Sequence, residues 1–179
     1  MSTIQVKDKF FKPFISSEEI QAAIERVADE MNKDLAGKNP IFICVLNGAF
    51  MFAADLYKNI RIDSEITFMR MKSYEGMETS GHVKCISGLM EDVKDRTVVV
   101  IEDIVDTGYT MKSIIAQLEE KGASEVLIAT LLHKPEALKV PELKLDYVAL
   151  TIPNAFIVGY GLDYDEMGRN LKDIYVIAD

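Results

Sequence analysis

Short apolar runs alternate with helical patterns of apolar and polar residues along most of this chain. The runs have the length and the β-branched character of strands, and the clearest of them, Val98 to Ile101, is apolar at every position. Such a strand is apolar on both faces, as expected in a parallel sheet that helices cover from both sides. The strands predicted in this way are Ile41–Leu46, Ile66–Met71, His82–Ile86, Val98–Ile101, Val126–Leu132, Asp146–Thr151 and Asp173–Ile177.

Three helices are predicted from the same patterns. The first begins with a capping-box pair, Ser16 and Glu19, and runs on to Gly37. The second, Phe50 to Tyr57, follows a turn at Asn47-Gly48-Ala49. The third has apolar residues at spacing i, i+3, i+4, i+7, namely Met111, Ile114, Ile115 and Leu118. Because strands and helices alternate, we predict an α/β fold with a mainly parallel, twisted sheet flanked by helices.

Two segments do not follow these patterns. Residues 1–15 mix aromatic and basic residues without a period, and we expect an arm laid over the domain. Residues 72–81, between two predicted strands, are polar and contain glycines, which is typical of a mobile lid and equally of a solvated loop. The chain has 179 residues with no repeat or linker, so we expect one domain over residues 1–179.

The stretch after Val98–Ile101 carries the clearest chemistry. Glu102 and Asp103 follow the strand at once and Asp106 comes shortly after, so we expect an acidic loop between the strand and the third helix. Ligands of open α/β sheets bind at this carboxyl end of the strands. A helix N-terminus preceded by Gly108 suits a phosphate, and the acid pair suits ribose hydroxyls or Mg²⁺. The pattern indicates a phosphoribosyl ligand; the alternative is that Asp106 and Thr107 only cap the helix while the acid pair is solvated.

Charge and composition narrow the classes of function. The formal net charge is −9 and the sequence pI is about 4.8, which argues against a general binder of nucleic acid or of membrane surfaces. Cys44 and Cys85 are far apart in apolar strand patterns, so we expect reduced thiols. With no apolar run near the ~20 residues of a membrane span and no signal-peptide pattern, we expect a cytoplasmic protein.

Several common site motifs are missing from the sequence. There is no GxxxxGK[ST] pattern, so a P-loop is not expected, and Gly159-Tyr160-Gly161 lacks the third glycine of a dinucleotide fingerprint. The two histidines, His82 and His133, form no HExxH motif and there is no cysteine cluster, which argues against zinc. No GxSxG nucleophile elbow occurs.

The run from Glu102 through Asp106 to Thr110, behind its apolar strand, resembles the phosphoribosyl-pyrophosphate motif of the type I phosphoribosyltransferases. More narrowly, the chain is similar to members acting on hypoxanthine and guanine, from Ile41 to Asp179. The resemblance implies that family's fold, with a hood formed by the N-terminal arm and residues 152–179. It also implies a homodimer or homotetramer working in purine salvage.

The resemblance assigns roles to residues on the purine side of the site. Phe156 matches the aromatic residue that stacks on the purine, and the backbone at Ile157 would meet the edge of the base. Lys134 matches the lysine that donates to the 6-oxo group, which an ammonium can do for hypoxanthine but not for the amino group of adenine. Asp163, beside the purine, resembles the aspartate associated with a second Mg²⁺.

Other roles concern pyrophosphate. Arg169 resembles the arginine that contacts it, and Ser73-Tyr74 matches the pair in the family's closing loop. The family's pyrophosphate turn often has lysine or arginine before glycine, whereas this chain has Asn47-Gly48.

The implied reaction is a displacement at the anomeric carbon of ribose, giving IMP or GMP and pyrophosphate. Mg²⁺ would be held by Glu102, Asp103 and Asp163, and the positive charge of the ribosyl group would develop near the acid pair. Asp106 would manage the proton at purine N7 as general base or acid. The residues that would hold the 5′-phosphate are Thr107, Gly108, Tyr109 and Thr110.

Three alternative functions are consistent with parts of the same pattern. A regulatory protein could keep the sugar site and lose the chemistry, but Asp106, Lys134 and Phe156 are all in place. A receiver-type signalling domain would need an aspartate after Ile41–Leu46, where Asn47 stands. A transferase that prefers another base, xanthine above all, stays open.

Overall fold

Two β-sheets organise the computed structural model, which describes residues 2–75 and 82–178. In these residues the larger sheet has the strand order β5-β4-β3-β6-β7-β8 and the smaller sheet has the order β1-β2-β10-β9. The strands of the larger sheet are β3 (Ile41–Val45), β4 (Glu65–Glu75), β5 (His82–Ser87), β6 (Thr97–Val105), β7 (Glu125–His133) and β8 (Tyr147–Thr151). Those of the smaller sheet are β1 (Ile4–Val6), β2 (Lys9–Ile15), β9 (Ile157–Val158) and β10 (Ile174–Ile177).

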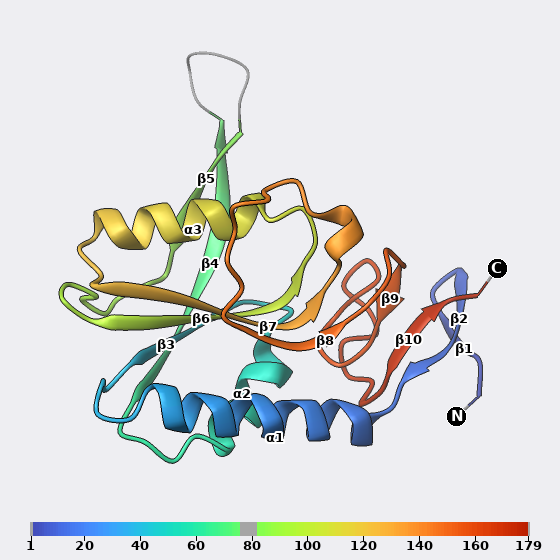
Figure 1. Cartoon of the computed structure of the whole chain (residues 1–179). Helices are drawn as coiled ribbons and strands as arrows, with labels where there is room; N and C mark the ends of the chain where they lie inside the picture. Colours follow the sequence, from blue (N-terminus) through green and yellow to red (C-terminus); the bar gives the residue numbers. More distant parts are fainter. Residues whose placement is uncertain (1, 76–81, 179) are drawn as a thin grey trace.

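Helices cover both faces of the larger sheet. The helices α1 (Ser17–Asp34) and α2 (Phe50–Lys58) lie on one face, and α3 (Tyr109–Glu120) lies on the other (Figure 1). Every neighbouring pair of strands is parallel except β4 and β5, which form an antiparallel hairpin. The α/β prediction with a mainly parallel sheet is therefore confirmed.

The central strands are buried on both faces, as their uninterrupted apolar runs predict. In β3, Phe42 and Cys44 pack into the core beneath α1 and α2, whereas Ile41 and Ile43 pack into the core beneath α3. All four side chains are fully buried. This double burial fixes β3 and its parallel neighbour β6 side by side, with their carboxyl ends at one edge of the sheet.

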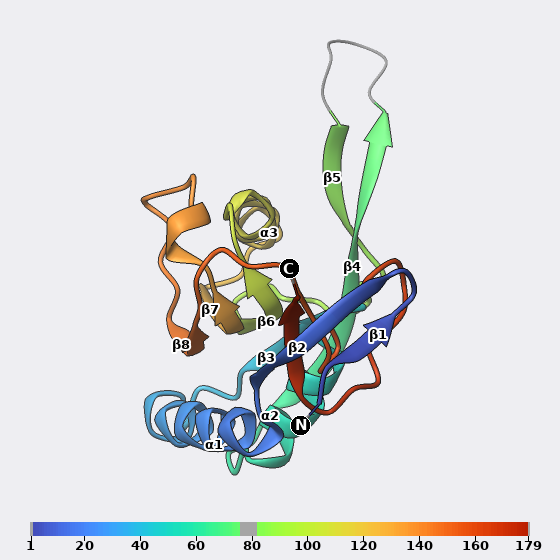
Figure 2. The same ribbon diagram turned by 90° about the vertical axis from the view of Figure 1, so that its right-hand side faces the viewer.

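The smaller sheet joins the two ends of the described chain. Residues 1–15 have no periodic pattern, yet within them β1 and β2 form a hairpin, and β10 pairs with β2 so that Ile177 lies opposite Phe11. The other edge of β10 pairs with β9, a strand the sequence did not predict. Figure 2 shows β1, β2 and β10 from the side on which they cap one end of the larger sheet. Because β2 and β10 pair although they are distant in the sequence, no local pattern predicts the smaller sheet.

Three element boundaries differ from the sequence predictions by three residues or more. Strand β6 continues to Val105, so Glu102 and Asp103 lie within the strand and the predicted acidic loop is wrong at these two positions. Strand β4 continues to Glu75, so the first part of the predicted lid is strand; the rest of it, residues 76–81, lies outside the described residues. Helix α1 ends at Asp34 and not at Gly37.

Both cysteines are free thiols, as predicted. Within the part of the chain that the structure describes, no helix is long and apolar enough to cross a membrane.

The first testable prediction concerns the start of α1. The Ser16 side chain accepts a hydrogen bond from the Glu19 backbone N–H at 3.2 Å, and the Glu19 carboxylate accepts one from the Ser16 N–H at 2.8 Å. Replacing Ser16 with alanine leaves the Glu19 N–H without this partner, so the free energy of unfolding should fall by about 1 kcal/mol. Urea denaturation measures the change. Ser17→Ala, one position into the helix, is the control, and an equal loss in both variants would contradict the capping explanation.

Candidate active site

The candidate site begins where β3 and β6 end next to each other. After β3 the chain turns through Leu46, Asn47 and Gly48; the peptide bond between Leu46 and Asn47 is cis, and the Asn47 carbonyl accepts a hydrogen bond from the Phe50 N–H at 3.2 Å. Gly48 lies against the carboxylate of Asp103, so that any Cβ at this position would overlap the carboxylate oxygen. The turn after β3 and the acid pair of β6 are therefore in direct contact.

The two carboxylates of the acid pair are not freely solvated. Glu102 is only 8% exposed and Asp103 is half-buried. The Glu102 carboxylate accepts a hydrogen bond from the Asp103 N–H at 3.0 Å, and the Asp103 carboxylate accepts one from the Ile104 N–H at 2.6 Å. Burial raises the pKa of both carboxyls, and for Glu102 the charge of Asp103 raises the pKa further. The alternative of a solvated pair is wrong, because one member is almost fully enclosed.

The same environment affects the neighbouring thiol of Cys44. Burial, with the nearby charges of Glu102 and Asp103, raises the pKa of Cys44 to about 12. A thiol with so high a pKa stays protonated and is a poor nucleophile. Cys44 is therefore part of the core beneath the site and takes no part in its chemistry.

A loop from the carboxyl-terminal part of the chain closes over this contact. An added Cβ at Gly161 would overlap the Gly48 carbonyl oxygen, so the two glycines lie back to back. Arg169 donates to the Gly161 carbonyl at 2.8 Å and pairs with Asp163 at 3.2 Å. The positive charge of Arg169 also opposes the rise in the pKa of Asp103. Gly161 carried no signal in the sequence that tied it to Gly48, since this contact is between distant segments.

The loop between β6 and α3 forms the next part of the site. Asp106 is exposed, and its carboxylate accepts a hydrogen bond from the Thr107 N–H at 2.5 Å. Gly108 is the N-cap of α3 with φ +89°, a left-handed conformation that favours glycine, and α3 has no side-chain cap. The alternative in which Asp106 and Thr107 cap the helix is therefore wrong.

A small pocket of about 60 Å³ lies in this loop. It brings Glu102 of the acid pair together with Asp106 and most of the predicted phosphate residues, while Tyr109 is 61% exposed at the start of α3. The lining residues are Glu102, Ile104, Val105, Asp106, Thr107, Gly108, Thr110 and Met111.

The segment after β7 supports the back of this loop. The Thr107 carbonyl accepts a hydrogen bond from the Lys139 N–H at 2.9 Å. A Cβ at Gly108 would come within 3.0–3.3 Å of the side chains of Leu138, Val140 and Leu143. The sequence analysis missed this support, because these apolar residues stand in an irregular stretch with no period.

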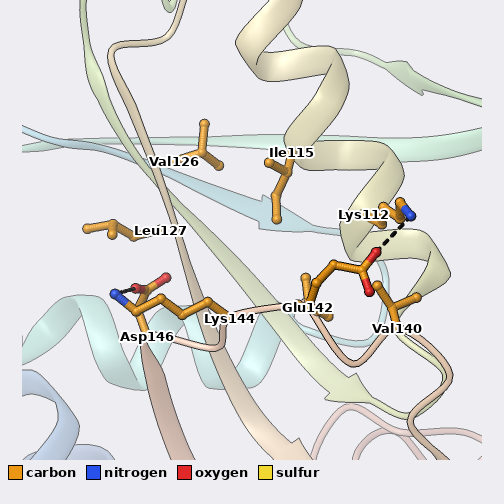
Figure 3. A pocket seen from close by; sticks show the side chains of 9 residues that line it. Lys112, Ile115, Val126, Leu127, Val140, Glu142, Lys144 and Asp146 are labelled. Atoms are coloured by element: carbon orange, nitrogen blue, oxygen red, sulfur yellow. Dashed lines mark hydrogen bonds and ion pairs between the residues drawn. The ribbon is translucent and has the colours of Figure 1, made fainter.

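A larger pocket of about 370 Å³ opens between α3, β7 and residues 140–146 (Figure 3). Its floor is apolar, and ion pairs between Lys112 and Glu142 and between Lys144 and Asp146 lie at its rim. None of the predicted site residues lines it.

Lys134 lies at the end of β7, next to the end of β6. Its N–H donates to the Val105 carbonyl at 3.0 Å, and its backbone is not helical, as Pro135 predicts. The short 3₁₀ helix η1 (Pro135–Ala137) begins directly afterwards. The neighbouring His133 has a buried Nε2 with no hydrogen-bond partner in the described structure, and burial lowers the pKa of its ring.

Phe156 and Ile157, which are also predicted to meet the purine, lie at the smaller sheet. Phe156 is 46% exposed, and its carbonyl accepts a hydrogen bond from the Ile177 N–H at 2.9 Å. Ile157 is buried in β9, opposite Val176. Ser73 and Tyr74, predicted for the closing loop, belong to β4 by their backbones, and their side chains lie outside the described residues.

The carboxylates of the site fit a metal ion only in part. In residues 2–75 and 82–178 no three histidine, cysteine, aspartate or glutamate side chains lie close enough to hold one together. Mg²⁺ commonly takes one or two carboxylates and completes its shell with water and substrate oxygens, which fits Glu102 and Asp103. Asp163 fits less well, because its two oxygens already contact Arg169 and the Glu166 N–H.

Comparisons with known proteins show which family this chain is similar to. Residues 16–165 match the phosphoribosyl transferase domain family. The chain is 43% identical over 169 residues to the hypoxanthine-guanine phosphoribosyltransferase of Streptococcus pneumoniae, covering 94% of this chain and 93% of that protein. A crystal structure of a hypoxanthine phosphoribosyltransferase from Staphylococcus aureus superposes with a TM-score of 0.85 at 37% identity, covering 93% of this chain and 91% of the other. A hypoxanthine-guanine phosphoribosyltransferase structure from Bacillus anthracis gives 0.83 at 35% identity, with 94% and 98% covered.

The second testable prediction follows from the buried carboxyl of Glu102. Its folded-state pKa lies above its unfolded value, so between the two values the folded protein binds more protons than the unfolded chain, and stability falls as the pH rises through that interval. In metal-free protein, Glu102→Gln removes this charge and should be more stable than the parent at about pH 8, with the advantage shrinking towards about pH 5.

Urea denaturation in the presence of a chelator, at several pH values, measures this difference. Glu120→Gln changes an exposed carboxyl at the far end of α3 and serves as the control. A gain in Glu102→Gln of the same size at every pH would contradict the electrostatic cause.

Proposed function

This chain belongs to the phosphoribosyltransferase family, and from this premise we propose that it transfers the 5-phosphoribosyl group of phosphoribosyl pyrophosphate to N9 of hypoxanthine and guanine. The products are IMP or GMP and pyrophosphate, and the role is purine salvage. A cytoplasmic homodimer or homotetramer, which the resemblance implies, is part of the same proposal. Similarity to named hypoxanthine-guanine enzymes over more than nine-tenths of the chain supports the choice of substrates.

One observation carries the proposal: the buried carboxylate of Glu102, from the acid pair, lies in one small pocket with the glycine-capped N-terminus of α3. The free N–H groups at the start of α3 hold the 5′-phosphate, together with the hydroxyls of Thr107 and Thr110. Gly108 lets the backbone approach the phosphate closely. Glu102 and Asp103 then face the ribose hydroxyls and accept hydrogen bonds from them. This division keeps the carboxylates off the phosphate, which they would repel.

Mg²⁺ is the cofactor in this proposal, held by Glu102 and Asp103 with Asp163 associated. When bound, it neutralises charge on the pyrophosphate leaving group. The raised pKa of the acid pair supports the assignment, because two carboxyls that repel each other in a buried place favour a cation between them. Their negative charge also favours the positive charge that develops on the ribosyl group during displacement.

Two further side chains act on the base. Asp106 is exposed at the mouth of the pocket and holds or receives the proton at purine N7. Lys134 donates to the 6-oxo group from the neighbouring strand end, and Phe156 stacks on the ring with the part of its surface that is open.

The pyrophosphate side depends on backbone and on one cation. Gly48 offers its backbone at the turn after β3, and Arg169 supplies the positive charge. Asn47 has no charge to add, so this site holds pyrophosphate with one basic side chain fewer than the family pattern Lys-Gly or Arg-Gly provides. The role of the Ser73-Tyr74 pair in a closing loop remains a prediction.

The third testable prediction is the reaction itself. Phosphoribosyl pyrophosphate and Mg²⁺ are supplied with hypoxanthine, guanine, xanthine or adenine, and nucleotide formation is followed by ultraviolet absorbance. We expect turnover with hypoxanthine and guanine, none with adenine, and loss of activity when Mg²⁺ is chelated. Lys134→Met should lower kcat/KM for hypoxanthine at least about tenfold, since a hydrogen bond from a charged donor is lost.

The control is Lys139→Met, which changes an exposed lysine five residues further along the chain. If no base is turned over but phosphoribosyl pyrophosphate binds in the presence of Mg²⁺, the enzymatic proposal is contradicted. A regulatory binding protein would then be the better explanation.

The fourth testable prediction separates chemistry from binding at Asp106. Asp106→Ala should reduce kcat by about 10²–10⁴, the range for losing a general acid or base, and change KM for phosphoribosyl pyrophosphate much less. Steady-state kinetics with Glu120→Ala as the exposed-carboxylate control measures both constants. Equal losses in kcat and in sugar affinity would rule out the proton role.

A further inference from the structure

Phe156 is packed by two other aromatic rings on the smaller sheet. Its ring centroid lies 6.0 Å from that of Phe11, which is fully buried, and 5.8 Å from that of Tyr164, with an interplanar angle of 89° to the latter. Edge-to-face contacts of this kind are favourable and directional. Nearly half of the Phe156 surface nevertheless stays open. The orientation of the open part of the ring is therefore set by what holds Phe11 and Tyr164.

Tyr164 is held by the turn between β1 and β2. Its hydroxyl donates to the Asp8 carboxylate at 2.8 Å, and the Lys9 ammonium lies 5.7 Å from the centre of its ring. Next to this contact, Lys7 forms an ion pair with Asp165. Three consecutive residues of the N-terminal turn thus meet two consecutive residues that lie more than 150 positions further along the chain.

The ionisation of both partners fits a persistent hydrogen bond. The bond to Tyr164 holds the pKa of Asp8 below its usual range, and the same bond raises the pKa of the Tyr164 phenol. Around neutral pH the carboxylate accepts and the phenol donates.

The loop that carries Tyr164 needs such contacts. Its turn is closed by two hydrogen bonds between Tyr164 and Met167, at 2.9 and 3.0 Å, and its central residues Asp165 and Glu166 have φ +50° and +67°. Non-glycine residues rarely adopt this left-handed conformation, and they persist in it when the surrounding structure fixes them. The Asp163 carboxylate fixes it from one side by accepting the Glu166 N–H at 2.8 Å. The N-terminal turn fixes it from the other.

We propose that Asp8 is a positioning residue for the purine base, acting through the Tyr164 hydroxyl to set the orientation of the Phe156 ring. The inference rests on the proposed function, since it deepens the role of Phe156 in holding the base. It gives the N-terminal hairpin a part in substrate affinity although no residue of that hairpin touches the substrate in the proposed site. The effect is confined to the base, because Asp8 and Tyr164 have no contact with the acid pair or with the phosphate loop among the interactions described above.

The fifth testable prediction compares Tyr164→Phe, Asp8→Ala and the double variant with the parent enzyme. Tyr164→Phe keeps the ring and removes only the hydroxyl. Both single variants should raise KM for hypoxanthine about three- to tenfold, the factor expected from one net hydrogen bond. The double variant should be no worse than either single one, because all three lack the same bond. KM for phosphoribosyl pyrophosphate and kcat should stay within about twofold of the parent values.

Two further variants show whether the effect is specific. Asp8→Asn keeps an oxygen acceptor for the phenol and should restore KM for hypoxanthine close to the parent value. Tyr147→Phe removes a comparable hydroxyl, which donates to Asp34 at 2.9 Å on the α1 side of the larger sheet, and should leave KM for the base unchanged. Thermal melting of each variant shows that it is folded.

The outcomes separate the two proposals. An active parent enzyme whose KM for hypoxanthine is unchanged in Tyr164→Phe and Asp8→Ala overturns the positioning role and leaves the proposed function intact. A joint loss of kcat and of affinity for both substrates also overturns it, since that pattern reports general disruption. If the parent protein turns over no base, that single measurement contradicts the proposed function, and it also overturns the positioning role, which rests on that function.

Discussion

The contact between Gly48 and the Asp103 carboxylate constrains the whole site. It exists because β3 and β6 are parallel neighbours buried on both faces, so that whatever follows β3 must pass over the acid pair of β6. No side chain fits at position 48, and the Gly48 carbonyl in turn meets Gly161. The end of β6, the turn after β3 and the carboxyl-terminal loop therefore stack directly on one another. Arg169 is held in this stack by its hydrogen bond to the Gly161 carbonyl.

The charges around this stack determine which groups it can bind. The protein carries a net charge of −9, and two of its carboxyls, one buried and one half-buried, lie at the point where a phosphate-rich substrate is proposed to bind. One arginine, held by the Gly161 carbonyl and by Asp163, lies close enough to affect the pKa of Asp103. The positive end of α3 is the other favourable group, and it lies where the 5′-phosphate is proposed to bind.

The sequence predicted the parts of the fold that depend on local pattern. The uninterrupted apolar run of β6, the capping box of α1 and the glycine before α3 each have a local cause, and each was confirmed. The smaller sheet was not predicted, because β2 finds its partner in β10 at the other end of the chain. The end of β6 was placed too early, since the side chains of Glu102 and Asp103 indicate solvent while the parallel pairing with β7 keeps their backbone in the strand. For the site, the sequence motif identified candidate residues, whereas contacts such as Gly161 against Gly48 were visible only in the structure. Such contacts join distant segments, so the spacing of residues in the sequence does not indicate them.

The strand order β1-β2-β10-β9 has a consequence for the order in which the molecule is built on the ribosome. Strand β10 lies between β2 and β9, so neither can be joined to the other until residues 174–177 have been synthesised. All strands of the larger sheet have been synthesised once the chain reaches Thr151. Because domains begin to fold as the chain emerges, the half proposed to bind phosphate can begin to assemble while the hairpin of β1 and β2 still lacks its partner β10. Phe11 then lacks its partners from β9 and β10 for most of synthesis, and the part of the site proposed to hold the base is completed last.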